Sequence, residues 1–208
     1  MAMSVKIYVP FYSRYGNVEQ MAKYVAEGVG EVEGAEPLLR LTVDDCTPAH
    51  VMAEHEHWLA AHERMLAEYD VADVEELAEC DGACFGSPTR FGSAAAPMCS
   101  FFESMAPLWL TGQLEGKPGG TFTSTASLHG GQEITSFTMW APMIHLGMII
   151  VGIPYSVPEL TTTKSGGTPY GPSHVAGQRA DRPVDETEAA VCRVLGRRVA
   201  QIATKLAN

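Results

Sequence analysis

The chain has 208 residues, of which 46% are apolar and 19% are charged, a composition that predicts one folded globular domain. The formal net charge is −11, and all of it lies in residues 44–81, which contain twelve acidic residues and one basic residue. An acidic chain without a basic stripe is not expected to bind nucleic acid, and no apolar run reaches the ~18 residues needed to insert in a membrane.

Hydrophobic periodicity predicts an alternation of strands and helices. In chain order these are a strand at 5–11, a helix at 17–33, a strand at 37–43, helices at 48–68 and 73–79, a strand at 81–87, a helix at 97–105, a strand at 119–124, a helix at 133–146, a strand at 148–153 and a helix at 184–206. The acidic helical stretch at about 44–80 is interpreted as an insertion with a solvated face, or else as a docking surface for a partner. The Gly- and Pro-rich stretch 154–183 is long for a loop, which predicts a role in function or assembly.

This alternation predicts an α/β fold, a doubly wound sheet of five parallel strands with helices on both faces. Pro37 places the second strand at an edge, which agrees with a flavodoxin-like strand order of 2-1-3-4-5. In such sheets ligands bind beyond the carboxyl ends of the strands. The loops after the first, third and fourth strands are therefore the candidate site.

Each of these three loops has chemistry that suits part of one ligand. Residues 13–18 offer hydroxyl and amide groups, a glycine and a helix start, which together suit a phosphate. Residues 87–93 bring an arginine and an aromatic ring to the same edge, and residues 124–133 are small, polar and glycine-containing, so their main chain can follow a flat ring. A phosphate, a chain and a flat ring are the parts of FMN, so the sequence predicts an FMN site.

Several motifs resemble those of the WrbA-type NAD(P)H:quinone oxidoreductases. They include Ser13-Arg-Tyr-Gly-Asn-Val18, Pro88-Thr-Arg-Phe-Gly92, His145-Leu-Gly-Met148 and Gly166-Gly-Thr-Pro-Tyr-Gly171, and they span nearly the whole chain. The resemblance implies a flavodoxin-like fold, FMN as cofactor, two-electron transfer from NADH or NADPH to a quinone by a ping-pong mechanism, and a homotetramer whose sites include residues of neighbouring chains.

The resemblance also implies roles for individual residues. Catalytic roles fall on His145 and Trp109, and substrate contacts fall on Trp109, Phe91 and Tyr155. The implied FMN-binding residues are Ser13, Arg14, Tyr15, Gly16, Asn17, Val18, Pro88, Thr89, Arg90, Phe91, Gly92, Ser124, Thr125, Ala126, Ser127, Leu128, His129, Gly130 and His145. The stretch Ala126 to His129 departs from the glycine-rich run usual in this family, so it predicts an altered third loop.

Two alternatives share the fold and the cofactor. One is an electron carrier of the flavodoxin type, since an acidic surface suits docking to basic partners. The other is a protein-binding, regulatory flavoprotein.

The five cysteines show no C-x-x-C pair, and no signal peptide is evident, which predicts reduced thiols in the cytoplasm. The histidines of the acidic segment match no zinc spacing, so no metal site is expected.

Overall fold

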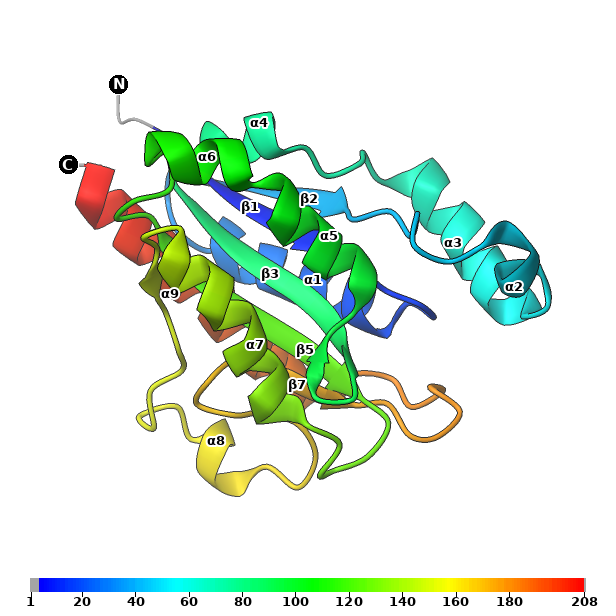
Figure 1. Cartoon of the computed structure of the whole chain (residues 1–208). Helices are drawn as coiled ribbons and strands as arrows, with labels where there is room; N and C mark the ends of the chain where they lie inside the picture. Colours follow the sequence, from blue (N-terminus) through cyan, green and yellow to red (C-terminus); the bar gives the residue numbers. More distant parts are fainter. Residues whose placement is uncertain (1–3, 208) are drawn as a thin grey trace.

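The computed structural model describes residues 4–207 and places a parallel sheet between two layers of helices (Figure 1). The strands are β1 (Val5–Phe11), β2 (Ala35–Leu41), β3 (Gly82–Arg90), β4 (Ser93–Ala94), β5 (Pro118–Thr125), β6 (Ile149–Ile150) and β7 (Ser173–Val175). The order along the sheet is β2-β1-β3-β5-β6, which confirms the predicted flavodoxin-like arrangement. Two short strands were not predicted: β4 pairs antiparallel with β3, and β7 pairs parallel with β5.

The helices are α1 (Asn17–Gly30), α2 (Ala49–Ala53), α3 (Glu56–Glu68), α4 (Val74–Ala78), α5 (Ala96–Ser104), α6 (Ala106–Thr111), α7 (Gln132–His145), α8 (Glu159–Thr162) and α9 (Glu186–Ala207). Figure 1 shows α5, α6 and α7 on one face of the sheet and α1 and α9 on the other. None of the helices in the described part of the chain is long and apolar enough to cross a bilayer.

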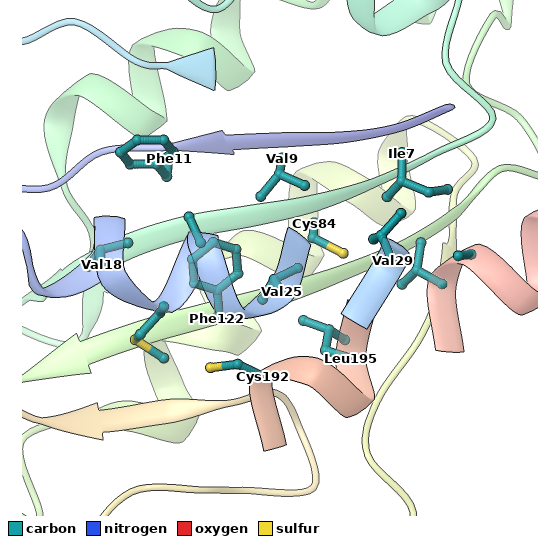
Figure 2. Close-up of a cluster of buried hydrophobic side chains, with 14 of the residues drawn as sticks. Ile7, Val9, Phe11, Val18, Val25, Val29, Cys84, Phe122, Cys192 and Leu195 are labelled. Atoms are coloured by element: carbon teal, nitrogen blue, oxygen red, sulfur yellow. The ribbon is translucent and has the colours of Figure 1, made fainter. Parts of the chain in front are cut away.

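One core fills the space between the sheet and the α1–α9 pair (Figure 2). Alternate residues of β1 point into it because side chains alternate along a strand, and α1 contributes one apolar face. The fully buried members include Ile7, Val9, Val25, Phe122 and Leu195. A second core lies on the opposite face, where Tyr8, Phe85, Met98, Met105 and Met139 are buried against α5, α6 and α7.

The acidic segment is helical but extends from the edge of the sheet. Helices α2 and α3 lie beyond the end of β2 in Figure 1, and α3 buries only Trp58 and Met65.

The predicted strand at 148–153 is regular only over Ile149–Ile150 and forms an edge, since β6 pairs with β5 alone. Farther along, β7 replaces β6 beside β5, so the outer edge of β5 is covered by two short strands in succession.

Candidate functional site

The three predicted loops surround one cavity at the carboxyl ends of the strands. All three contribute to its walls, and so does a fourth segment near the end of the long loop. The lining residues are Ser13, Arg14, Tyr15, Asn17, Val18, Pro88, Thr89, Arg90, Ser124, Thr125, Ala126, Ala176, Gly177, Gln178 and Ala180. The predicted convergence of the loops is thus present in the fold.

The first loop forms a tight turn into α1. Gly16 is the N-cap residue with φ +98°, a left-handed conformation that glycine adopts without steric cost. The Ser13 hydroxyl accepts hydrogen bonds from the N–H groups of Gly16 at 3.0 Å and of Val18 at 3.2 Å. The start of α1 therefore points its N–H groups and the positive end of its dipole at the cavity, as an anion site requires.

The charge of the cavity is opposite to that of the molecule. Its walls contain Arg14 and Arg90 but no aspartate or glutamate. Arg14 stacks on Trp58, with Cζ 3.6 Å from the ring centroid, and its Nε is buried without a hydrogen-bond partner in the described structure. Burial lowers the pKa of Arg90, whose Nη1 donates to the Thr89 carbonyl at 2.7 Å. An unpartnered guanidinium N–H in an acid-free cavity suits a phosphate ester, so the residues present fit FMN.

The second loop is a β-hairpin. Pro88, Thr89 and Arg90 belong to the end of β3, and the turn to β4 has Phe91 at φ +53° and Gly92 at φ +81°. Two positive φ values define a type I′ turn, which is strained at Phe91 because that residue has a side chain. The turn leaves the Phe91 ring fully exposed, and the ring does not line the cavity of its own chain.

The third loop is held by side chains of its own and of α7. The Thr125 hydroxyl donates to the Ser127 carbonyl at 2.8 Å, and Gln132 Nε2 donates to the carbonyls of Ser127 and Leu128 at 3.1 and 2.6 Å. Only its first residues, through Ala126, reach the cavity. Leu128 and His129 line a neighbouring groove with residues of the long loop, so the departure at 126–129 is divided between the cavity, at Ala126, and that groove, at Leu128 and His129. The FMN-binding roles of the residues in all three loops, Ser127 and Gly130 included, stay predictions.

The fourth wall is not identified by the sequence. Residues 176–180 lie at the end of the long loop, whose length predicts a function but not which of its residues carry it. They reach the cavity because β7 extends along β5, and the Asn17 side chain donates to the Ala180 carbonyl at 3.0 Å. The length of the loop is therefore the only sequence signal for this wall.

His145 and Trp109 lie together, but not with the three loops. They line a mostly apolar groove between α5, α6 and α7 with Phe102, Glu103, Met105, Ala106, Pro142 and Leu146. His145 is the last residue of α7, whereas the third loop precedes the first, and a helix of 14 residues is about 21 Å long. Tyr155 is 67% exposed and lines neither space. In one chain, His145 and Trp109 therefore lie near the C-terminal end of α7, whereas the third loop lies at its N-terminal end.

Two further sequence predictions concern the cysteines and metal binding. All five cysteines are free, and burial raises the pKa of the Cys80 thiol to about 12, as expected for a structural thiol. No cluster of His, Cys, Asp or Glu suited to a metal ion occurs within residues 4–207.

Comparison with solved structures defines the class of protein. A WrbA-like flavodoxin from Agrobacterium tumefaciens superposes with a TM-score of 0.63 at 21% identity, covering 97% of this chain and 99% of that one. Flavodoxin 1 from Bacillus cereus gives a TM-score of 0.60 at 16% identity over 94% of this chain and 97% of that one. With the cavity at the carboxyl ends of the strands, these likenesses define a protein of the flavodoxin-like fold.

Sequence comparison identifies the family. A family model described as NADPH-dependent FMN reductase matches residues 13–161. A protein of Geobacter metallireducens named NAD(P)H dehydrogenase (quinone) is 42% identical, covering 97% of this chain and 99% of its own. A protein of the same name from Chromohalobacter salexigens is 43% identical over 98% of this chain and 99% of its own. The chain belongs to the NADPH-dependent FMN reductase family, in agreement with the WrbA-type resemblance of its motifs.

Proposed function

We propose that this protein transfers two electrons from NADH or NADPH to quinones through a bound FMN. The observation that carries the proposal is the acid-free cavity between the three loops, where Arg14 and Arg90 form no ion pair with any described residue. FMN supplies the redox chemistry when bound, and the protein supplies orientation and charge. The names of the full-length relatives agree with this activity and with both nicotinamide donors.

Different residues of the chain would bind different parts of FMN. Ser13, Asn17 and the N–H groups at the start of α1 would hold the phosphate, with Arg14 and Arg90 balancing its charge. Thr89 and the main chain of residues 124–126 would border the rest of the cofactor. The hydroxyls of Thr89 and Thr135 of α7 are hydrogen-bonded to each other at 2.8 Å, and Thr135 also donates to the Gly131 carbonyl at 2.7 Å, which fixes the second loop relative to the third.

We also propose that the complete site is shared between copies of the chain, in a homotetramer. Two observations support this. His145 and Trp109 lie about one helix length from the loops of their own chain. In addition, Ile134, Phe137, Ala141 and Ile144 form an exposed apolar row on α7 at three- and four-residue spacing. A second copy on this row would bring its His145, Trp109 or Tyr155 toward the exposed Phe91.

The activity is tested by visible absorption. FMN-saturated protein should bleach when NADH or NADPH is added without oxygen and should recover with benzoquinone. FMN that binds but stays oxidised with both donors would contradict the proposed activity and favour an electron carrier.

For a ping-pong mechanism, initial rates at varied donor and quinone concentrations should give parallel double-reciprocal lines, and intersecting lines would contradict it.

The shared site is tested by complementation. Arg90→Glu should abolish FMN binding, and Trp109→Ala should remove the substrate contact, so each variant alone should be inactive. Co-expressed, they should form mixed assemblies in which some sites have an intact Arg90 from one copy and an intact Trp109 from another. Restored activity is expected, and its absence in assemblies shown to be mixed would contradict sharing.

We further propose a single domain, supported by two cores on one sheet, and a cytoplasmic location, supported by five free cysteines.

A further inference from the structure

Arg14, in the first loop, is held by aromatic rings and not by polar groups. Its Nε is buried without a hydrogen-bond partner, and no acidic residue lines the cavity beside it among the described residues. The guanidinium lies over two rings, with Cζ 3.6 Å from the centroid of Trp58 and 5.6 Å from that of Tyr15. An arginine side chain has many rotamers, so the nearer ring, that of Trp58, determines where the guanidinium points.

Stacking on Trp58 leaves the donors of Arg14 free for a ligand. A ring covers the face of a guanidinium, whereas its N–H groups point outward in the plane. Trp58 is only 4% exposed, and its Nε1 is buried without a hydrogen-bond partner in the described structure, so the indole acts through its face. Arg14 lines the cavity and Trp58 does not. Trp58 therefore acts on a ligand of this cavity through Arg14.

Trp58 belongs to α3, the longest helix of the acidic segment, and α3 is held beside the first loop. Arg64, six residues farther along α3, pairs with Glu19 of α1. A Cβ on Gly16, the N-cap residue of α1, would lie 3.6 Å from Nη2 of Arg64. Helix α3 therefore meets the first loop at two points, with Trp58 at Arg14 and with Arg64 at Gly16.

An aromatic partner suits the charge of this segment. Residues 44–81 have a net charge of −11, which by itself would repel a phosphate. A carboxylate beside Arg14 would hold the guanidinium but would also neutralise it and compete with the phosphate for its donors. An aromatic face attracts the guanidinium without accepting its in-plane hydrogen bonds. The contact with Trp58 thus orients Arg14 and keeps its charge available.

We propose that Trp58 is a positioning residue for FMN, which orients the Arg14 guanidinium toward the phosphate and so favours FMN over flavins that lack a phosphate. The inference rests on FMN occupying the cavity, as in the proposed function. A side chain that is oriented before binding loses less conformational entropy when the ligand arrives, which strengthens binding. The acidic segment then contributes to cofactor binding through one aromatic side chain.

Flavin affinity tests this role, measured for FMN and for riboflavin by the quenching of flavin fluorescence. Trp58→Leu should bind FMN about three- to tenfold more weakly, as expected when one flexible side chain must be ordered on binding. Its affinity for riboflavin, which has no phosphate, should match that of the wild type. Trp58→Phe retains a ring face and should recover most of the FMN affinity. An equal loss for both flavins would show that Trp58 only maintains the fold and would overturn the proposal.

A double-mutant cycle tests the same link with FMN alone. Arg14→Met should weaken FMN binding about tenfold or more, and adding Trp58→Leu should weaken it no further, because no guanidinium is left to orient. Additive effects would overturn the proposal. If Trp58→Leu fails to fold, Trp58→Met takes its place, since methionine fills core gaps without a ring face. Arg14→Met should also reduce the preference for FMN over riboflavin, and an unchanged preference would overturn the proposal without any change at Trp58.

Tyr24→Leu is the matched control. Arg193 Cζ lies 4.8 Å from the centroid of the Tyr24 ring, the same kind of contact outside the cavity, so both flavin affinities should stay unchanged. Neither affinity requires a donor or a quinone, so failure of this proposal is distinguishable from failure of the quinone reductase activity. A protein that selects FMN through Trp58 but does not reduce quinones would support the inference and contradict only the proposed reaction.

Discussion

At the scale of single residues, Glu19 shows how α1 tolerates a carboxylate beside an anion site. The side chain is 5% exposed and accepts two hydrogen bonds from Arg64, one of 2.9 Å from Nη1 to Oε1 and one from Nη2 to Oε2. Tyr69 donates to it at 3.0 Å, and Lys23 lies 3.0 Å away. Burial alone would raise the pKa of Glu19, but hydrogen bonds from these three residues lower it.

Removal of one partner should destabilise the fold in a pH-dependent way. Arg64→Met should cost about 1–2 kcal/mol at neutral pH, less than a fully buried pair, because Arg64 is half exposed and Glu19 keeps two donors. Since the pKa of Glu19 is lowered in the folded state, its contribution is present above the unfolded pKa of about 4.3 and is lost as the pH falls through the folded value. Urea unfolding at neutral and acidic pH should show the difference from wild type shrinking on acidification.

The matched control is Arg197→Met. Arg197 pairs with Glu31 where both side chains are about 40% exposed, so the expected cost is below about 0.5 kcal/mol at any pH. If Arg64→Met cost no more than this control, the view that Arg64 neutralises a buried charge would be wrong.

At the scale of elements, α1 and α9 pack backbone to backbone through two glycines. A Cβ on Gly196 would lie 1.9 Å from the carbonyl oxygen of Val25, and one on Gly28 would lie 2.0 Å from that of Arg193. Gly196→Ala should therefore force the helices apart and cost about 2 kcal/mol or more, in the range of overpacked cores. Gly30→Ala is the control, because a Cβ on Gly30 would meet nothing within 4 Å.

Thermal unfolding of Gly196→Ala and Gly30→Ala tests whether stability requires the close approach of α1 and α9. Gly30→Ala should be neutral or slightly stabilising, since alanine favours a helix by up to about 1 kcal/mol over glycine. Equal behaviour of the two variants would mean that the close approach of α1 and α9 is not required for stability.

At the scale of the whole molecule, the exposed apolar row on α7 predicts self-association. Ile144 is 61% exposed on this row, and Leu206, at the far end of α9, is 56% exposed. Ile144→Glu should dissociate the assembly because it buries a charge at the contact. Leu206→Glu should leave it intact. Light scattering after size exclusion measures both masses, and an unchanged mass for Ile144→Glu would exclude this face as the interface.

The fold and three walls of the cavity could be predicted because each depends on local pattern. Alternating strand and helix periods define the sheet, and the carboxyl ends of its strands bring Ser13, Thr89 and Ser124 to one edge. The 176–180 wall could not be predicted, since β7 is only three residues long and has no distinctive pattern.

The two-part edge of β5 has a consequence for motion. Among the described residues, β7 pairs with β5 over three residues and has no strand on its outer side, so it can detach while β6 and the rest of the sheet stay paired. Hydrogen–deuterium exchange should therefore separate the edge from the centre. The amide of Ala176, which donates to Thr125 at 2.7 Å, should exchange well before those of β3, because it needs only local opening. FMN should slow the exchange of the Ala176 amide. If, without FMN, this amide were as protected as those of β3, the β7 edge would open only when the whole sheet unfolds.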